Sequence, residues 1–352
     1  MIRTAVIGYG LSATVFHLPF IQHNADFALV AISTSQTTAA SARWPEATIY
    51  ADAHQLLAEC DCDLVVITAP NTSHAALARQ ALLRGCHVLV EKPLAVSSAE
   101  ARQLQQLALS TGRTLAVFHN RRFDDDFLAL QTLLREGALG QPRLLISRYD
   151  RCRPQVQPRW KESAAPGNGI LYDLGPHLLD QALALFGMPQ AISARCLALR
   201  PDSPAVDYFQ INLQYQQQDG RPALEVVLGS SPYQALQPLR FELHASLGSF
   251  RCYGFDPQEA LLRAQLSLQS ADWQQRGRLR TAELCGHEGA TPQQQALPDG
   301  DYAAFYAHLA ATILRQQPLV VPLAEAIAGL QLIELALQSS REQRTIAVPQ
   351  PA

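Results

Sequence analysis

Hydrophobic residues in the first 120 positions form short runs, separated by longer stretches with helical periodicity. The apolar runs that predict strands are residues 4–7, 27–33, 64–68, 88–90 and 115–118. The amphipathic stretches that predict helices lie between them, at residues 12–23, 73–84 and 98–110. Strands that alternate with helices of about 10–15 residues require crossover connections and therefore a parallel sheet. We expect residues 1–120 to form a doubly wound, Rossmann-type dinucleotide-binding domain.

Beyond residue 143 apolar and polar side chains alternate, which is typical of an antiparallel sheet with one covered face. The strand-like runs are residues 190–199, 206–216, 223–231, 239–246 and 249–254, and helices are expected at 173–186, 301–316 and 323–341. The Gln- and Gly-rich residues 267–300 predict long loops. We expect residues 121–352 to form an α/β domain with a mostly antiparallel, open-faced sheet, which binds the substrate and forms the oligomer contact.

Composition excludes several classes of protein. The chain has 352 residues, 48% of them hydrophobic, and a net charge of −3, so it can bury a large core but offers no basic surface for nucleic acid. No apolar run approaches the roughly 18 residues of a membrane span, and the N-terminus enters a strand without room for a signal peptide. Seven scattered cysteines predict reduced thiols in the cytoplasm and no metal site.

The first candidate for chemistry is a glycine turn between the first strand and the first helix. Its residues are Gly8, Gly10, Leu11, Ser12 and Ala13. The two glycines permit a tight turn and the close approach of a pyrophosphate, whose charge then lies at a helix N-terminus. A Gly-x-Gly sequence alone is often only a turn, but the strand–turn–helix context favours dinucleotide binding.

The second strand ends in Thr34, Ser35 and Gln36, and no acidic residue occurs between Phe27 and Pro45. NAD enzymes usually place Asp or Glu here to bind the ribose hydroxyls. Hydroxyl and amide groups instead suit the 2′-phosphate of NADP, so we favour NADP, with NAD as the alternative. The loop is also compatible with a polar surface that has no role in cofactor choice.

The third strand is followed by Pro70, Asn71 and His74. Ligands of open α/β sheets bind beyond the carboxyl ends of the strands, so these residues are expected near the cofactor. His74 is equally compatible with a structural place beside a helix cap.

A fourth strand runs into Glu91-Lys92-Pro93, and Lys92 is one of only two lysines in a chain with 26 arginines. Lys can lose its proton when it is partly desolvated, whereas Arg in effect cannot. We therefore expect Lys92 to act in proton transfer, although most lysines at strand ends are simple surface charges.

Asp173 and His177 are spaced four residues apart at the start of a predicted helix, with Pro176 in its first turn. A helix N-terminus disfavours an imidazolium ion, so a neutral His177 could serve as a base that Asp173 orients. A helix-capping Asp and a buried structural His are an equally good interpretation of this segment.

Together these motifs resemble the glucose–fructose oxidoreductase/inositol dehydrogenase family (Gfo/Idh/MocA) over nearly the whole chain. Glu91-Lys92-Pro93 looks like the family signature, and Asp173-x-x-x-His177 matches its catalytic spacing. Further motifs resemble the bacterial subgroup that includes NADP-dependent scyllo-inositol dehydrogenase: Phe16-His17-x-Pro19, residues 119–124, Arg153-Pro154, Arg159-Trp160 and residues 171–175. The chain departs from the commoner pattern at Ala13 and at Gln36, where the inositol enzyme carries Arg.

The resemblance implies a dehydrogenase that moves hydride between nicotinamide and a hydroxyl or ketone of a cyclic polyol or sugar. His177 would accept the hydroxyl proton, Asp173 would orient it, Lys92 would hydrogen-bond the substrate oxygen, and Glu91 and Lys92 would lie at the cofactor. Candidates for substrate contact are Asn120, Arg122, Tyr149, Arg159, Trp160, Tyr172, Asp173 and His177. Arg122 is equally compatible with a structural salt bridge.

The resemblance also implies a homodimer or homotetramer that associates through the C-terminal sheet. Two alternatives use the same fold without turnover. One is a sensor or regulatory protein that binds NADP, and the other is a module that only oligomerises. The presence of Lys92, Asp173 and His177 favours the enzyme over both.

Overall fold

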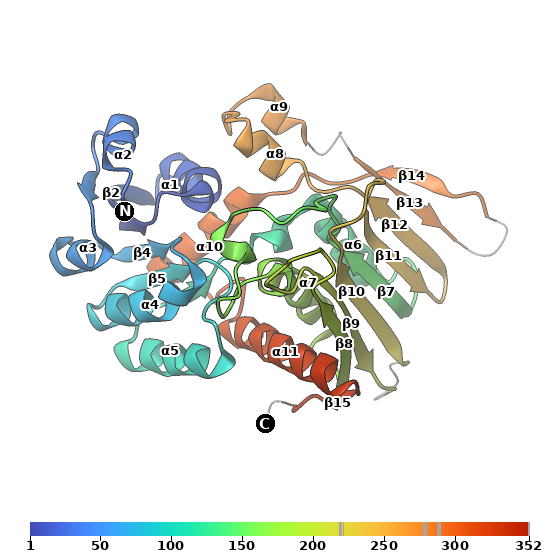
Figure 1. Ribbon diagram of the computed structural model, residues 1–352. Helices are drawn as coiled ribbons and strands as arrows, with labels where there is room; N and C mark the ends of the chain where they lie inside the picture. Colours follow the sequence, from blue (N-terminus) through green and yellow to red (C-terminus); the bar gives the residue numbers. More distant parts are fainter. Residues whose placement is uncertain (218–219, 221, 277–279, 287–289, 351–352) are drawn as a thin grey trace. The chain divides into compact units, whose positions relative to one another are not determined.

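Figure 1 shows a computed structural model of the protein, which describes residues 1–217, 220, 222–276, 280–286 and 290–350. The chain divides into two compact units. The first comprises residues 1–120, 258–274 and 301–327, and the second comprises residues 121–257, 275–300 and 328–352. The first unit therefore contains the expected nucleotide-binding segment together with two segments from much later in the sequence.

The first unit, all of whose residues are described, is built on a six-stranded parallel sheet with the order β3-β2-β1-β4-β5-β6. The strands are β1 (Ile2–Ile7), β2 (Phe27–Ser33), β3 (Thr48–Tyr50), β4 (Leu64–Ile67), β5 (His87–Val90) and β6 (Leu115–Val117). The chain moves to one side of β1 and then, at β4, to the other. This change of direction creates the switch point at which doubly wound sheets bind ligands, and it confirms the predicted Rossmann arrangement.

Helices connect the strands of this sheet. They are η1 (Ala13–His17), α1 (Leu18–His23), α2 (Thr37–Arg43), α3 (Ala53–Glu59), η2 (Asn71–Ser73), α4 (His74–Leu83) and α5 (Ser98–Thr111). Local sequence explains the bounds of α5, because the Ser97 side chain accepts a hydrogen bond from the Glu100 N–H at the start, and Gly112 adopts a left-handed conformation at the end. The short elements α2, α3 and β3 are additional to the elements predicted from the sequence.

An aromatic cluster explains why later segments join the first unit. These segments contain α8 (Gln258–Arg263), α9 (Ala271–Gln274) and α10 (Tyr302–Arg315). The ring of Tyr306 stacks on Phe20 with a centroid distance of 6.0 Å, and Phe305 meets Phe118 edge-on at 4.8 Å. Aromatic side chains bury large apolar areas, so this packing completes the core of the first unit.

The described part of the second unit contains a nine-stranded sheet with the order β14-β13-β12-β11-β7-β10-β9-β8-β15. Among its described strands only β7 and β10 pair in parallel, which confirms a mostly antiparallel sheet. The strands are β7 (Pro142–Arg148), β8 (Ala191–Leu197), β9 (Tyr208–Tyr215), β10 (Leu224–Ser230), β11 (Leu239–Ala245), β12 (Gly248–Tyr253), β13 (Thr281–Cys285), β14 (Gln293–Ala296) and β15 (Ile346–Ala347).

Alternation along β9 separates the two faces of this sheet. Phe209, Ile211 and Leu213 are fully buried, whereas the intervening Gln210 and Asn212 are only partly buried. The helices of this part of the chain are α6 (Asp125–Glu136), α7 (Ile170–Phe186) and α11 (Leu323–Glu342), with the short turns η3 (Asn120–Phe123) and η4 (Trp160–Glu162). Helix α7 packs against β9 and β10, as Figure 1 shows, so one face of the sheet is covered.

The prediction of long loops at residues 267–300 is wrong in part. Helix α9 and strands β13 and β14 lie in this segment, while residues 277–279 and 287–289 fall outside the described residues. Strand β14 forms an edge of the sheet, and all four of its residues are exposed. A strand without a buried face shows no alternation in its sequence, which explains the error. Within the described ranges, no helix is both long and apolar enough to cross a membrane.

Candidate active site

The glycine turn of the first unit follows β1 directly and is shaped by backbone contacts. The Gly8 N–H donates to the Ser33 carbonyl at 2.9 Å, and Gly8 has a φ of +104°. A Cβ at Gly8 would collide with the Thr68 side chain, so the close packing of β1 and β4 here requires glycine. A Cβ at Gly10 would meet no atom within 4 Å, so the space beside this residue is open. The second glycine thus leaves room for a ligand to approach the backbone.

Glu91 joins the glycine turn to the Glu-Lys-Pro corner. Its carboxylate accepts a hydrogen bond from the Ser12 hydroxyl, and the same oxygen lies 3.1 Å from His17 Nε2. The other carboxylate oxygen accepts from the Lys92 N–H at 3.0 Å. Burial opposes ionisation of Glu91, but the His17 contact, Lys92 and Ser12 outweigh it and lower its pKa to about 2. An ionised Glu91 therefore fixes the backbone of Lys92 relative to the turn.

His74 supports the same corner from α4. Its side chain is 1% exposed, with Nδ1 2.7 Å from the Pro93 carbonyl and Nε2 2.8 Å from the Ala69 carbonyl. Burial lowers the pKa of His74. The ring therefore ties the end of β4 to Pro93, which corresponds to the structural alternative for this residue. Pro70 is exposed and Asn71 half-buried at the same strand end.

The end of β2 presents polar groups of two kinds. Thr34 is buried, and its hydroxyl accepts a hydrogen bond from the Gln36 N–H at 3.0 Å. Ser35 and Gln36 are exposed, and the Gln36 side chain reaches the Tyr9 carbonyl of the glycine turn at 3.4 Å. Thr34 thus shapes the loop, while Ser35 and Gln36 remain accessible beside the turn.

In the second unit, helix α7 begins at Ile170 and carries Asp173 and His177. Gly169 precedes it with a φ of +88°, and the Ile170 N–H donates to the Val206 carbonyl at 2.7 Å. Pro176 therefore lies inside the helix, and the prediction that Pro176 and His177 occupy its first turn is wrong. Because the effect of a helix N-terminus is confined to the first turn, it does not explain a neutral His177.

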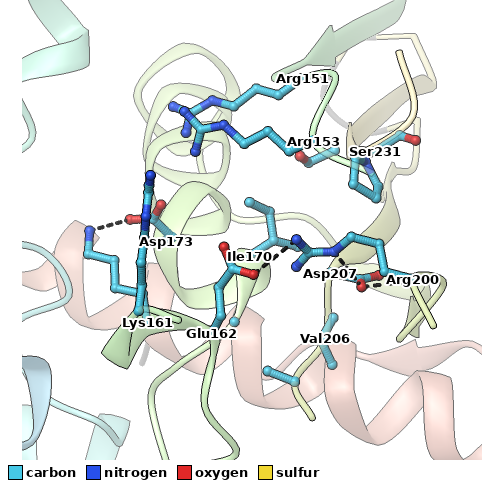
Figure 2. Close-up of a pocket in the computed structure, with 15 residues that line it drawn as sticks. Arg151, Arg153, Lys161, Glu162, Ile170, Asp173, Arg200, Val206, Asp207 and Ser231 are labelled. Atoms are coloured by element: carbon cyan, nitrogen blue, oxygen red, sulfur yellow. Dashed lines mark hydrogen bonds and ion pairs between the residues drawn. The ribbon is translucent and has the colours of Figure 1, made fainter. Parts of the chain in front are cut away.

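A small pocket of about 80 Å³ in the second unit is bounded by Asp173 and by the loop before α7 (Figure 2). Lys161 Nζ lies 2.8 Å from Asp173 Oδ1. The loop holds Lys161 in place because the Gly169 N–H donates to the Lys161 carbonyl at 2.8 Å. Arg200 forms the opposite wall, with ion pairs of 2.9 Å to both Glu162 and Asp207. Asp173 is thus a charged group at a pocket with several cations.

Comparison with known proteins assigns both units to one family. Residues 2–119 match the oxidoreductase family Gfo/Idh/MocA in its NAD-binding Rossmann fold, and residues 131–348 match the C-terminal alpha/beta domain of the same family. The chain belongs to the Gfo/Idh/MocA family. It is accordingly an oxidoreductase of an NAD(P)-binding family, as the motifs predicted.

Individual relatives match over nearly their whole length. The oxidoreductase YdgJ of Escherichia coli (strain K12) is 40% identical over 349 residues, which cover 99% of each chain. IolW of Bacillus subtilis (strain 168), a scyllo-inositol 2-dehydrogenase (NADP(+)), is 34% identical over 348 residues, or 98% of this chain and 95% of IolW. A solved oxidoreductase structure from Yersinia pestis is 38% identical with a TM-score of 0.91, and covers 100% of this chain and 98% of that one.

The side chains predicted to contact substrate in this Gfo/Idh/MocA chain occupy different environments. Arg159 lines the pocket, and the exposed Trp160 lies in the same loop with Lys161 Nζ 5.6 Å from its ring centroid. Tyr149 is 2% exposed and stacks on Phe255 at 4.3 Å.

The other predicted contacts lie outside the residues that line the pocket. Arg122 pairs with Asp180 through two hydrogen bonds of 2.8 and 2.6 Å, which is the structural alternative left open for it. Asn120 is buried, and the half-buried Tyr172 has its pKa raised by burial and by Glu334.

Lys161 lines the pocket beside Asp173, and the sequence analysis did not name it as a candidate. As the second of only two lysines, beside the Arg159-Trp160 motif, it carried the same rarity signal as Lys92. Arg200 was also missed, and no local signal marks it, because it reaches the pocket only through the packing of residues 200–207 against the loop before α7.

Proposed function

We propose that the protein is an NADP-preferring oxidoreductase that transfers hydride between nicotinamide and a secondary hydroxyl or ketone of a cyclic polyol or sugar. The observation that supports this proposal is that each unit holds part of the candidate set. The first unit contains Lys92, whose backbone Glu91 fixes, and the second carries Asp173 and His177 on α7. The name of IolW, a scyllo-inositol 2-dehydrogenase that uses NADP(+), supports both the polyol class and the cofactor.

The first unit suits a dinucleotide at the switch point of its sheet. The open space at Gly10 lets a pyrophosphate approach the backbone N–H groups that begin the helix formed by η1 and α1. Ser35 and Gln36 provide uncharged donors for a 2′-phosphate at the end of β2, and no carboxylate there repels it. When bound, the nicotinamide supplies the hydride chemistry.

Side chains of the protein accept and stabilise the proton that leaves the substrate hydroxyl. In the oxidation direction His177 accepts the proton of the substrate hydroxyl, and Asp173 on the preceding turn of α7 orients the imidazole. Lys92 hydrogen-bonds the substrate oxygen and stabilises the charge that develops on it. Lys161 stabilises the ionised form of Asp173 through their 2.8 Å contact. Asn120 and Arg122 remain proposed substrate contacts, together with Tyr149, Arg159, Trp160 and Tyr172.

The proposal is tested by NADPH oxidation against inososes and ketosugars, and by NADP(+) reduction against inositols and aldoses, with NAD(H) in parallel. Turnover of at least one compound, faster with the phosphorylated cofactor, is expected. Tight NADPH binding without turnover of any compound would instead support the alternative of a non-catalytic sensor. Faster turnover with NADH would overturn the cofactor preference alone.

The cellular compartment and the oligomeric state of the protein are also part of the proposed function. All seven cysteines are free thiols, which supports a reducing, cytoplasmic compartment. We also propose a homodimer or homotetramer that associates through the other face of the nine-stranded sheet. In Figure 1, α7 and α11 lie on one side of this sheet, and no helix among the described residues of the second unit covers the other side.

A further inference from the structure

The pocket beside Asp173 carries an excess of positive charge. Its described lining includes five cations, Arg151, Arg153, Arg159, Lys161 and Arg200, and three acids, Glu162, Asp173 and Asp207. Each acid contacts Lys161 or Arg200, at distances of 2.8 to 2.9 Å. The pocket therefore has a net positive charge even with all its acids ionised, which favours an anionic ligand.

Backbone pairing directs two of these arginines to one side. The Arg151 N–H donates to the Ser231 carbonyl at 3.0 Å, and the Arg153 N–H donates to the Pro232 carbonyl at 2.7 Å. The intervening Cys152 forms an antiparallel bridge with Tyr233. In extended backbone, residues two apart point to the same side. Figure 2 shows the two side chains running alongside one another, with their guanidinium groups at the same end.

Two neighbouring guanidinium groups repel one another, and an anion placed against both removes that cost. The Arg151 guanidinium is further positioned by the Tyr149 ring, whose centroid lies 5.2 Å from its Cζ. Guanidinium groups match the planar oxygen pairs of carboxylate and phosphate groups, which they bind through two parallel hydrogen bonds. A single water needs roughly 10–15 Å³ of such space, so a pocket of about 80 Å³ accommodates a group of several atoms.

We propose that the substrate is an anionic polyol or sugar, whose carboxylate or phosphate group binds Arg151 and Arg153. This inference rests on the proposed function, because it places the reacting hydroxyl near Asp173 and the anionic group on a different carbon. Substrates of this class are sugar acids and phosphorylated sugars.

The test compares compounds that differ only in the anionic group: D-glucose, D-glucuronate and D-glucose 6-phosphate. For the wild-type protein with NADP(+), we expect kcat/KM for an acidic compound to exceed that for glucose at least tenfold. The acid and the phosphate ester distinguish the two sources of the anion. Equal or better turnover of glucose than of both anions would overturn the inference and leave the proposed function intact.

Substitutions of Arg151 and Arg153 test whether these residues cause the preference for anionic compounds. Arg151→Gln and Arg153→Gln should each lower kcat/KM for the preferred anion at least tenfold, mainly through KM, and change the glucose value less than threefold. Arg153→Lys should recover part of the loss. Arg143→Gln is the matched control, because Arg143 is exposed on β7 outside the pocket. Equal effects on glucose and on the anions would overturn the inference.

Calorimetric binding of the same three compounds separates failure of this inference from failure of the proposed function. Anion binding that is stronger than glucose binding and weakened by Arg151→Gln would support the anion site even if no compound is turned over. Absence of both turnover and anion-selective binding would reject both proposals. If Arg153→Gln does not fold, as judged by its thermal transition, the wild-type compound series and Arg151→Gln still decide the outcome.

Discussion

Glu91 shows how single residues set the geometry of this protein. The carboxylate contacts Ser12, His17 and the Lys92 backbone, so it connects the glycine turn with the strand that ends in Lys92. The sequence analysis placed Glu91 at the cofactor, and in the structure its carboxylate binds side-chain and backbone groups of the first unit. Its ionisation is coupled to folding, because the charged form has partners only in the folded state.

Glu91→Gln should lower the stability of the first unit in a pH-dependent way. The pKa of Glu91 falls from 4.5 to about 2 on folding, so its charge stabilises the fold above pH 4.5, and this contribution disappears as the pH falls toward 2. A shift of this size corresponds to roughly 3 kcal/mol at neutral pH. Thermal unfolding should show a lower Tm for the variant at pH 7 and a smaller difference at pH 3.

Glu46→Gln provides the control for this measurement, because Glu46 is exposed. It should leave Tm nearly unchanged at both pH values. A difference between wild type and Glu91→Gln that is constant from pH 3 to pH 7 would contradict the coupling.

Lys92→Arg should lower kcat by a factor of about 10² or more, in the range expected for a positioned acid–base group. Arg keeps the positive charge but loses the transferable proton and the compact ammonium geometry. NADPH affinity should fall far less, since the pyrophosphate is expected at the Gly8–Ala13 turn. Steady-state kinetics and fluorescence titration measure the two effects, and near-wild-type turnover would refute the catalytic assignment.

Ser35→Asp should move cofactor preference toward NAD(H). Ser35 is exposed at the end of β2, where a carboxylate would accept hydrogen bonds from free ribose hydroxyls and repel a 2′-phosphate. The ratio of dissociation constants for NADPH and NADH, measured by nicotinamide fluorescence, should change in favour of NADH by at least tenfold. If wild type already binds NADH more tightly, the preference for NADP is wrong.

At the scale of elements, the start of α7 determines where Asp173 and His177 lie. The helix begins directly after Gly169, whose conformation and close contact with the Val206 backbone admit no side chain. The sequence predicts a later start because Pro176 suits a first turn. In the structure the Ile170 N–H donates to the Val206 carbonyl, and this contact fixes the N-terminus of the helix at an earlier residue. One contact between segments distant in sequence therefore moves Asp173 and His177 deeper into the helix than predicted.

Gly169→Ala should destabilise the second unit and reduce activity. A Cβ would lie 2.7 Å from the Val206 carbonyl oxygen, at a φ of +88° that L-residues rarely adopt. The free energy of unfolding should fall by about 2–3 kcal/mol, and thermal unfolding should show this as a lower Tm. Gly137→Ala is the control, since Gly137 also has a positive φ but open space around it, and should cost only about 1 kcal/mol. Equal losses for the two variants would show that the Val206 contact is unimportant.

At the scale of the whole molecule, the face of the nine-stranded sheet opposite α7 is the proposed surface for association, and it is mostly polar along β9. The apolar residues of β9 are buried on the face covered by α7, and the opposite face presents Gln210, Asn212 and Gln214, with Val227 on β10. An association through this face would therefore use polar contacts around a small apolar centre. Non-obligate interfaces have this composition.

Light scattering at micromolar concentration should show a dimer or tetramer. Val227→Arg should shift the protein toward smaller species, because it places a charge at the centre of the proposed interface. Gln293→Arg on the exposed edge strand β14 should not. A monomeric wild type would reject association through this face.

The sequence by itself determined the parallel sheet of residues 1–120 and its glycine turn. Strands that are buried on both faces consist of continuous apolar runs, so they can be recognised from a short stretch of sequence. The placement of Asp173 and His177 on one side of a helix was also readable, because residues four apart share a helix face whatever the exact start of the helix.

Only the tertiary structure decided the composition of the first unit, the pairing of Lys161 with Asp173, the pairing of Arg122 with Asp180, and the edge strands β13 and β14. Residues 258–274 and 301–327 join the first unit through aromatic contacts between positions more than 180 residues apart, and such contacts have no local signature. The ion pairs depend on how the short turns η3 and η4 meet helix α7. Strand β14 has no buried face and pairs with β13 through hydrogen bonds.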